Sequence, residues 1–564
     1  MPARIIRMAF DVVADTVTRL RLMDGFQYRD TYFEFMTTSI LAFGVVVFLI
    51  ALTTGFFTFL NRQTIIVMSR LIEFDLKNDI FDHYQKLDAS FYKRNSTGDL
   101  MNRISEDVSR VRMYLGPAVM YTTNMIVVFV LVVSSMLSVN VKLTLYVLLP
   151  LPFLSVSIYY VSSIINQKSE RVQKKLSSIS TFVHEAISGI RVYKAYNLGK
   201  FRDEIFENET EEYKQINLDL VRVNALFMPL MFLLIGLSTI LTIYVGGNLA
   251  IAGEITSGNI AEFVIYVNML TWPVAVVGWV TSMVQRAAAS QKRINEFLDT
   301  EPKIFSHTQE NTPITGDIEF KNVSFTYPDS GSKALKNVSF KVKHGQSIAI
   351  TGRTGSGKTT IAQLITRLYD TTTGNIQING SEIKKLNLSD LRTHIGYVNQ
   401  DVFLFSDTIA NNIRFGVDEE HGTKEAIEKA AIQADIYANI IQLPDGFETE
   451  IGERGVTLSG GQKQRISMAR ALITNPEILI LDDSLSAVDT ETEDTILKHL
   501  DSFMEGRTTI IISHRISSIK NCDHILVLDE GEIIESGTHQ ENMKHEGLYK
   551  MLYEQQLLEE RVNN

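Results

Sequence analysis

The sequence contains one cysteine, Cys522, and little charge for a chain of 564 residues. A single cysteine excludes a disulfide framework and any metal cluster built from cysteines, and it is typical of a catalytic part kept in a reducing compartment. Charged residues make up 21% of the chain, and a net charge of -11 argues against a nucleic-acid-binding protein. Hydrophobic residues make up 45%, and mean hydropathy is +0.05. Apolar residues must therefore be concentrated in one part of the chain.

Five apolar runs in the first half have the length of membrane-spanning helices, about 20 residues for ~30 Å of hydrocarbon. They cover residues 35–60, 116–139, 143–165, 226–252 and 260–284. A soluble bundle would alternate apolar and polar faces, whereas these runs hold almost no charge, apart from Glu262. The sequence therefore predicts a transmembrane domain at residues 1–300, a linker at 301–316 and a soluble domain at 317–564.

The charge of the connecting segments predicts how these helices cross the membrane. Segments 61–115 and 166–225 are rich in Lys and Arg, which places both in the cytoplasm. The short connections 140–142 and 253–258 then face outside. The long inner segments have helical character, so we expect the helices to extend well beyond the membrane.

The start of the chain differs from a membrane span. Arg4, Arg7 and Asp11 interrupt its apolar residues too early for a span or a signal sequence. We expect residues 1–15 to be the outer end of a first span that is missing or truncated; the alternative is a genuine five-span protein. An intact mass that places Met1 at the N-terminus of the native protein would support the alternative.

A glycine-rich loop is the clearest motif of the soluble domain. It lies between a buried strand at residues 347–351 and a helical stretch at residues 360–369. Glycines let backbone N–H groups close around phosphate oxygens, Lys358 reaches the outer phosphates, and the Thr359 hydroxyl can ligate Mg²⁺. The predicted ATP-binding residues of this loop are Gly352, Arg353, Thr354, Gly355, Ser356, Gly357, Lys358, Thr359 and Thr360.

Two further motifs follow the glycine-rich loop. The apolar strand at residues 477–482 ends in Asp482, where a Walker B strand places a carboxylate for Mg²⁺. Residues 457–465 form a Ser-Gly-Gly turn that leads into a helix, and the N-terminus of that helix could bind a second phosphate group. A plain structural interpretation of the turn is a capped helix start with Ser459 as the N-cap residue.

Together these residues resemble the ATP-binding-cassette (ABC) transporter family, in which the signature sequence corresponds to Leu458, Ser459, Gly460, Gly461 and Gln462. A membrane half and a cassette in one chain resemble an exporter-type half-transporter, similar to bacterial multidrug and lipid exporters. The resemblance implies an α-helical transmembrane bundle of the domain-swapped exporter type, followed by an α/β P-loop ATPase cassette.

The other cassette motifs occur in the expected order. By resemblance, Tyr327 stacks on adenine, Gln400 is the Q-loop residue near Mg²⁺ and the attacking water, and His514 is the switch histidine. Without this context, Tyr327 would be interpreted as a strand aromatic and His514 as a satisfied core histidine. The remaining matches are the X-loop at residues 450–455 and the D-loop at residues 486–489, which ends in Asp489.

The family implies ATP and Mg²⁺ as cofactors and a dimer as the working unit. Two cassettes sandwich two ATP molecules head to tail, so the signature turn of one chain completes the Walker site of the other. The implied metal ligands are Thr359, Gln400 and Asp482. Segments near residues 96–99 and 185–191 resemble coupling helices that dock on a cassette beside its Q-loop; the alternative is two solvent-exposed helix tips.

One residue departs from the family pattern. The position after Asp482 is usually the glutamate that polarises the attacking water, and here it is Asp483, which is one methylene shorter. A base must come within about 2.6–3.2 Å of its proton, so we expect slow hydrolysis at this chain's own catalytic residues, Asp483, His514 and Gln400. Some exporters are heterodimers with one degenerate site, and this chain resembles their degenerate subunit. We therefore expect a heterodimer, with a homodimer as the alternative.

The resemblance predicts ATP-driven export of an amphipathic, drug-like or lipid-like substrate across the cytoplasmic (inner) membrane, with the cassette in the cytoplasm. Membrane lipid and a second half-transporter are the expected partners, and nucleic acid is not. The rival function is an ATP-gated channel or a regulatory subunit that does not pump. Several polar residues of the spans are candidates for lining a substrate path, although each could equally be a helix–helix hydrogen-bond partner. They are Tyr121, Asn124, Tyr159, Tyr244 and Asn268.

Overall fold

The computed structural model of the chain describes residues 2–22, 29–197, 199–452, 458–485 and 490–563. The chain folds into two compact units. The first combines Met1–Phe81 with Met101–Asp299, and the second combines Asp82–Leu100 with Thr300–Asn564. A short segment from the middle of the helical region therefore belongs to the second unit.

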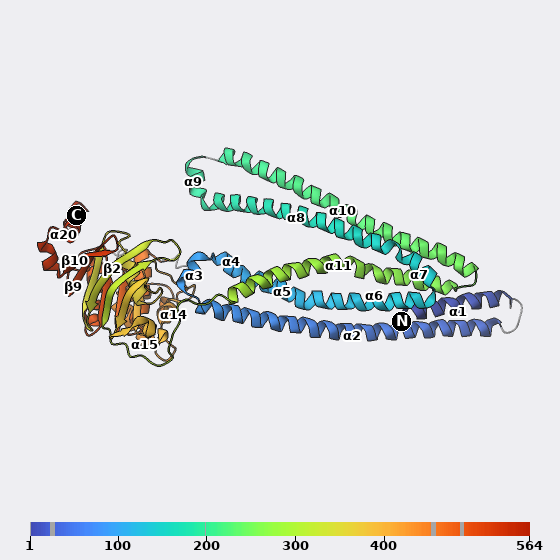
Figure 1. The fold of residues 1–564 in the computed structure, drawn as a ribbon, viewed down its shortest axis with the longest axis horizontal. Helices are drawn as coiled ribbons and strands as arrows, with labels where there is room; N and C mark the ends of the chain where they lie inside the picture. The colour runs from blue at the N-terminus through green and yellow to red at the C-terminus, as the bar shows by residue number, and fades with distance from the viewer. Residues whose placement is uncertain (1, 23–28, 198, 453–457, 486–489, 564) are drawn as a thin grey trace. The chain divides into compact units, whose positions relative to one another are not determined.

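The first 300 residues form α-helices, several of them very long (Figure 1). Among the described residues, five helical segments are long and apolar enough to cross a membrane, and four of them contain a whole apolar run, while the helix that matches run 226–252 ends at Ile251. Since α2 has 58 residues, it extends about 87 Å at 1.5 Å per residue, far more than a ~30 Å hydrocarbon core. The elements are α1 (Pro2–Leu22), α2 (Arg29–Lys86), α3 (Ala89–Arg94), α4 (Thr97–Asn102), the π-helical η1 (Arg103–Asp107), α5 (Val108–Met113), the π-helical η2 (Tyr114–Ala118), α6 (Val119–Val139), α7 (Val141–Leu148), α8 (Pro150–Ser188), α9 (Ile190–Ala195), α10 (Gly199–Ile251) and α11 (Ser257–Leu298).

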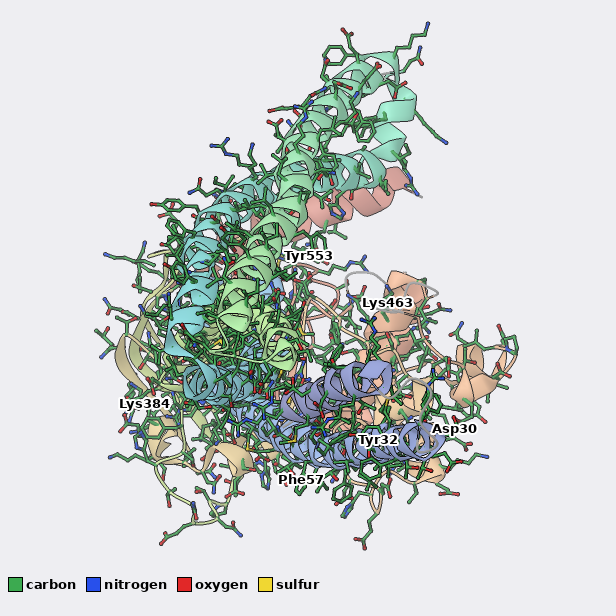
Figure 2. All side chains as sticks on the ribbon, turned by 90° about the vertical axis from the view of Figure 1, so that its right-hand side faces the viewer. Asp30, Tyr32, Phe57, Lys384, Lys463 and Tyr553 are labelled. Atoms are coloured by element: carbon green, nitrogen blue, oxygen red, sulfur yellow. The ribbon has the colours of Figure 1, made fainter. Side chains whose placement is uncertain are left out.

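The first unit has an apolar core and an apolar outer surface. Leu143 of α7 and Phe263 and Leu270 of α11 are fully buried in a cluster to which α6, α8 and α10 also contribute. Ser238 on α10 donates a hydrogen bond to the carbonyl of a buried residue of α7 at 3.1 Å, so its hydroxyl is satisfied inside the bundle. The helices α8 and α10 run antiparallel, side by side (Figure 1). Large apolar side chains such as Phe57 project from α2 (Figure 2), as expected of a surface that faces lipid.

A buried charged cluster joins α1 to α11. Glu262 on α11 is fully buried, and its carboxylate lies 3.6 Å from the guanidinium of Arg7 and 4.0 Å from that of Arg4. The hydroxyl of Tyr266 donates to the same carboxylate at 2.8 Å. Asp11 accepts hydrogen bonds at the start of α11, including one from the backbone N–H of residue 258 at 3.0 Å. The two arginines that interrupt the apolar start of the chain are therefore partners of the one carboxylate in the last apolar run, and Asp11 binds the start of the same helix.

The second unit is an α/β cassette whose described part contains two sheets. The larger sheet has the strand order β10-β9-β3-β8-β7-β6 and is parallel except for β10. The smaller sheet is antiparallel, with the order β2-β1-β4-β5. The strands are β1 (Ile318–Thr326), β2 (Lys333–Val342), β3 (Ser347–Gly352), β4 (Thr373–Ile378), β5 (Ser381–Glu382), β6 (Ile395–Val398), β7 (Ile478–Asp482), β8 (Thr508–Ile512), β9 (His524–Asp529) and β10 (Glu532–Gly537).

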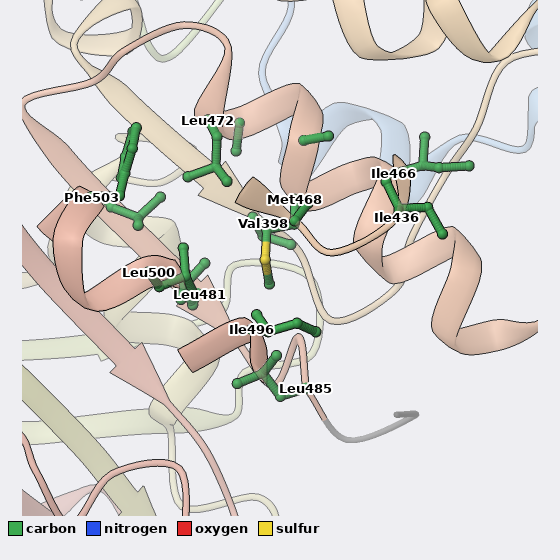
Figure 3. Packing of buried hydrophobic residues seen from close by; sticks show 14 of the residues in the cluster. Val398, Ile436, Ile466, Met468, Leu472, Leu481, Leu485, Ile496, Leu500 and Phe503 are labelled. Carbon is green, nitrogen blue, oxygen red and sulfur yellow. The ribbon is translucent and has the colours of Figure 1, made fainter. Parts of the chain in front are cut away.

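Two apolar clusters hold the cassette together, one on each side of the larger sheet. Part of the first cluster is shown in Figure 3, where Met468 and Leu472 of α17 face Leu481 of β7. Burying a side chain of this kind stabilises the fold by ~1.5–3 kcal/mol. The helices are α12 (Lys358–Ile365), η3 (Ile383–Lys385), α13 (Leu388–Thr393), α14 (Ile409–Arg414), α15 (Lys424–Gln433), α16 (Tyr437–Ile441), η4 (Gly446–Glu448), α17 (Gly460–Leu472), α18 (Thr490–Met504), α19 (His539–Lys544) and α20 (Leu548–Asn563).

The helix after the glycine-rich loop is shorter than predicted. The sequence predicts a helical stretch at residues 360–369, whereas α12 ends at Ile365. Arg367 adopts a left-handed φ of 49°, which ends the helical hydrogen-bond pattern. Its guanidinium lies 3.2 Å from the carboxylate of Asp370, so the turn is held by an ion pair.

Candidate functional site

Four of the predicted motifs meet at one edge of the larger sheet. Strands β3, β8, β7 and β6 are parallel neighbours, so their carboxyl ends lie at the same edge. The glycine-rich loop follows β3, His514 follows β8, Asp483 follows β7 and Gln400 follows β6. The strand order, which the motifs alone do not specify, therefore assembles one site from four distant segments.

The glycine-rich loop has a backbone shape that side chains would prevent. Gly357 adopts a φ of 100°, and a Cβ there would clash with the carbonyl of Ala334. Gly352 adopts a φ of 138°, and a Cβ there would clash with the carbonyl of Leu528. The hydroxyl of Ser356 is buried and has no hydrogen-bond partner in the part of the chain that the structure describes. This hydroxyl and the loop N–H groups fit a phosphate ligand.

Lys358 is folded back onto the loop that it follows. Its ammonium donates hydrogen bonds to the carbonyls of Gly352 at 3.0 Å and Arg353 at 2.7 Å. Burial lowers the pKa of Lys358 to about 8, although the carboxylates of Asp483 and Asp482 act in the opposite direction. A phosphate group would supply the anionic partner that this buried amine needs.

Two oxygen groups suited to Mg²⁺ lie side by side. The hydroxyl of Thr359 donates a hydrogen bond to the carboxylate of Asp482 at 3.1 Å. Asp482 is 1% exposed, and burial raises the pKa of its carboxyl. Hydroxyl and carboxylate oxygens are the ligands that Mg²⁺ prefers, so two of the three predicted ligands could hold the ion together with a nucleotide. Bound Mg²⁺ would neutralise phosphate charge at this point.

Tyr397 is a site residue that the motifs did not reveal. It lies on β6, and its hydroxyl donates to the second carboxylate oxygen of Asp482 at 3.3 Å. Burial and the neighbouring carboxylate raise the pKa of Tyr397, so its hydroxyl stays protonated. Tyr397 reaches Asp482 because its strand lies beside the Walker B strand, and the sequence does not reveal which strands are neighbours.

Gln400 and His514 both interact with Asp483, which occupies the position usually held by the catalytic glutamate. The side-chain amide of Gln400 donates to the carboxylate of Asp483 at 3.3 Å. Asp483 itself has a left-handed φ of 49°, a conformation that aspartate tolerates better than most residues. Burial and the charge of Lys358 lower the pKa of His514, whereas Asp483 raises it, so the imidazole lies in the field of both groups.

Tyr327 is tied to the helix that follows the glycine-rich loop. Its hydroxyl lies 3.0 Å from the hydroxyl of Thr360 and donates to the side-chain carbonyl of Gln363 at 3.0 Å. Phe325 and Tyr369 pack edge-on against its ring, with centroid distances of 4.8 and 5.5 Å. These contacts fix the ring beside the phosphate loop, where an adenine could stack.

The signature turn is separate from the assembled site. Ser459 caps α17: its side chain accepts from the N–H of Gln462 at 3.3 Å, and its own N–H donates to the Gln462 side chain at 2.9 Å. Ser459 and Gly460 are exposed. Within the described ranges, the hydrogen bonds of this turn are internal, and none joins it to the Walker residues. Asp489, the rest of the D-loop and residues 453–455 of the X-loop lie outside the described residues.

The geometry defines a class of protein: a multi-pass membrane protein that carries its own nucleotide-binding P-loop domain. Family models agree with both parts. The model for the ABC transporter transmembrane region matches residues 5–274, and the ABC transporter model matches residues 335–486. The chain belongs to the ABC transporter family, and its cassette is an ATPase of that family.

Several named relatives match most of the chain. A probable multidrug resistance ABC transporter ATP-binding/permease protein of Bacillus subtilis, YheI, is 38% identical and matches 87% of this chain and 84% of its own length. The multidrug resistance-like ATP-binding protein MdlA of Escherichia coli is 35% identical, covering 93% and 89%. An ATP-dependent lipid A-core flippase of Pseudomonas syringae is 37% identical, covering 90% and 84%.

The fold is also similar to that of a solved structure. A bacterial Atm1-family ABC exporter with ATP bound superposes with a TM-score of 0.78 at 26% identity, covering 99% of this chain and 96% of its own. The predicted fold class, a transmembrane bundle followed by an ATPase cassette, is confirmed, and so is the predicted resemblance to exporters.

Proposed function

We propose that this chain is one half of an exporter that moves an amphipathic, drug-like or lipid-like substrate across the cytoplasmic membrane. Its relatives support ATP-driven export as the general function. The observation that carries the proposal is the assembled Walker site, in which Thr359 bonds to Asp482 and Lys358 lies in the field of that carboxylate, in the same chain as five candidate spans. Bound ATP and Mg²⁺ would occupy this site, with the cassette on the cytoplasmic side.

In this proposal, a second half-transporter completes the exporter. The exposed start of α17, at Ser459 and Gly460, is available to face the phosphates of a partner's nucleotide. ATP would then bridge two cassettes, and its hydrolysis would release them. Because Asp483 replaces the usual glutamate, we favour a heterodimer in which the partner supplies the efficient catalytic site.

The first coupling segment supports a link between the inner loops and the adenine side of the site. Ala89 of α3 packs against the cassette core, and Asp88 accepts a hydrogen bond from the backbone N–H of Lys303 at 3.1 Å. The ammonium of Lys93 lies 4.6 Å from the ring centroid of Tyr327. These contacts, made by residues just before the predicted coupling segment, lie at the aromatic residue proposed to stack on adenine. Docking of residues 96–99 beside the Q-loop stays a prediction.

The second coupling segment has an apolar tip. Ile190, Val192 and Tyr196, in and next to α9, are exposed. The cassette also carries an aromatic patch of three exposed side chains near its Q-loop. We define the aromatic patch as Phe403, Phe405 and Phe415. Two exposed apolar surfaces of this kind favour docking, which in the domain-swapped arrangement joins the tip of one subunit to the cassette of the other.

A cavity in the first unit supports an amphipathic substrate. It has a volume of about 340 Å³ and lies between α8 and α11. Asn166 and Gln285 face it from the two helices, together with several hydroxyl groups, while Ile158 and Val277 supply an apolar wall. Of the candidate lining residues, Tyr159 borders this cavity; Tyr121 packs edge-on against Trp279. A polar headgroup with an apolar tail would match such a lining.

Substrate-stimulated ATP turnover of the reconstituted complex tests the cavity. Asn166→Leu and Gln285→Leu each remove a hydrogen-bonding group, so each is expected to raise the half-stimulating concentration of an amphipathic drug or lipid by about threefold to tenfold. Tyr146→Phe, at an exposed position of α7 outside the cavity, is the control and should leave that concentration unchanged. Equal values for all three variants would contradict a substrate site in this cavity.

A regulatory role without pumping is the second candidate function. Asp483 favours this role, because a site that hydrolyses ATP slowly keeps ATP bound for long periods and can regulate the complex. This candidate and the exporter differ in whether the complex concentrates a substrate at the expense of ATP.

A further inference from the structure

The loop that carries His514 is held by the C-terminal helix of the chain. Gln556, on α20, uses both ends of its side-chain amide. Its carbonyl oxygen accepts a hydrogen bond from the backbone N–H of Ile516 at 2.8 Å, and its NH₂ group donates to the backbone carbonyl of His514. One planar amide thus fixes two backbone groups of opposite polarity, two residues apart.

The start of α20 is itself anchored in the cassette. Tyr549 is fully buried, and its hydroxyl lies 2.7 Å from Nδ1 of His539. The backbone N–H of Leu548 donates to the carboxylate of Glu535 at 2.5 Å. Since Tyr549 and Gln556 are seven residues apart, they lie on the same face of α20, two turns from each other. The helix therefore presents the amide from a fixed base.

A second helix holds the same loop from its other side. Glu493 on α18 is 1% exposed, and its carboxylate lies 2.6 Å from the guanidinium of Arg515. It also accepts hydrogen bonds from Ser517 at 3.3 Å and from Ser518. The loop after β8 is thus held between α18 and α20, and its conformation depends on both.

We infer that Gln556 is a positioning residue for His514 and that α20 takes part in the recognition of ATP. His514 lies in the field of Lys358 and Asp483, at the outer-phosphate end of the site. The direction of its ring is set by the backbone that Gln556 holds, and a displacement of ~1 Å is enough to weaken a catalytic or binding contact severely. This inference rests on the role proposed for His514 at the outer phosphate.

Photolabelling of this subunit with 8-azido-ATP, in the full complex and with MgATP or MgADP as competitor, tests the inference. Gln556→Leu removes both hydrogen bonds, so it should weaken competition by MgATP about threefold to tenfold and leave MgADP unchanged, because the outer phosphate is what His514 senses. Gln556→Glu should lose at least as much, since a carboxylate oxygen would face the carbonyl of His514. Glu554→Leu, an exposed position of the same helix, is the matched control and should change neither competitor.

A double-variant cycle separates positioning from general stability. In a His514→Ala background, Gln556→Leu should have no further effect on MgATP competition. Equal losses for MgATP and MgADP, or an undiminished loss in the His514→Ala background, would overturn the inference and indicate a purely structural contact. If His514→Ala alone changes nothing, the proposed role of His514 fails, and the positioning role of Gln556 fails with it. Absence of labelling in the unsubstituted complex would instead contradict ATP binding at this site.

Discussion

Asp483 decides what the nucleotide site of this chain can do. It receives a hydrogen bond from Gln400 and lies in the field of His514, so its surroundings are those of a catalytic base. Its carboxylate is one methylene closer to its own backbone than that of a glutamate. We therefore expect this site to bind ATP and to hydrolyse it slowly, because the side chain of Asp483 is short.

Asp483→Glu is expected to raise ATP turnover at this chain's site by at least about tenfold, because a correctly placed general base contributes ~10²–10⁴ in rate. Turnover by the purified subunit and by the complex measures the effect. Asp483→Asn, which keeps the length but removes the charge, is the control. Robust turnover by the unsubstituted subunit alone, unchanged by Asp483→Glu, would contradict a degenerate site.

Lys358 makes ATP binding dependent on pH. Its pKa is lowered to about 8 in the nucleotide-free site, and a bound phosphate raises it, so the protonated amine is favoured by binding. The affinity for MgATP should be highest well below pH 8, where Lys358 is protonated. It should fall as pH rises through about 8, by up to about tenfold per pH unit. Isothermal titration calorimetry in buffers of different ionisation enthalpy should detect proton uptake near pH 8.5.

Lys358→Arg supplies the control for this pH dependence, because a guanidinium stays charged over the whole range. The variant should bind without taking up a proton at pH 8.5, whatever its affinity. The same proton uptake in the variant and in the unsubstituted chain would show that another group titrates.

The sequence identified the motif residues because their spacing encodes local geometry. Gly357 and Lys358 could be assigned from a strand, a loop and a helix that are contiguous in the chain. Tyr397 and Gln556 could not, because each acts through a segment far away in sequence. Contacts of that kind depend on strand order and on where the last helix docks, which no short motif specifies.

At the scale of elements, a cluster of ion pairs joins α1 to α11 within the apolar first unit. The carboxylate of Glu262 has two guanidinium groups, of Arg4 and Arg7, and a tyrosine hydroxyl around it. The composition of the last run predicted a membrane span, and Glu262 stood out as its exception. What the sequence could not reveal is that the partners of this carboxylate lie about 250 residues earlier.

Glu262→Ala is expected to lower the free energy of unfolding by about 1–3 kcal/mol, because it leaves two guanidinium groups without their carboxylate. Denaturant or thermal unfolding of the complex in lipid-containing micelles measures the loss. Adding Arg7→Ala should cost less than the sum of the two single variants, since both remove the same contact. Glu254→Ala, an exposed position before α11, is the control, and a loss no larger than in this control would contradict a stabilising cluster.

The lengths of the helices could be predicted from the sequence, but their π-helical turns could not. The apolar runs and the basic, helix-prone segments between them indicated long continuous helices, and α2 and α10 have 58 and 53 residues. The π-helical turns η1 and η2 were not predicted. Pro117 lies within η2 and lacks the N–H that an α-helix would use there, which gives one physical reason for the change in hydrogen bonding.

At the scale of the whole molecule, the proposed exporter consists of two subunits with a mechanical link between them. We expect the exposed signature turn to supply the nucleotide contact and the aromatic patch to supply a docking surface for a coupling segment. Both features are exposed in this chain, and both fit a partner that carries the matching parts.

Replacing Phe405 and Phe415 of the aromatic patch with serine is expected to reduce substrate stimulation of ATP turnover at least about fivefold, because the docking surface loses its apolar area. Labelling of the cassette by 8-azido-ATP should persist, since the patch lies outside the Walker site. Ile432→Ser, an exposed apolar position on α15, is the control. Unchanged stimulation in the double variant would exclude this patch as the docking surface.

Transport in inverted membrane vesicles that contain the reconstituted complex tests the central claim most directly. We expect MgATP to drive an amphipathic fluorescent dye into the vesicles against its concentration gradient, and a non-hydrolysable ATP analogue not to do so. Dye movement that stops at equal concentrations and occurs equally with the analogue would contradict an exporter and would indicate an ATP-gated path.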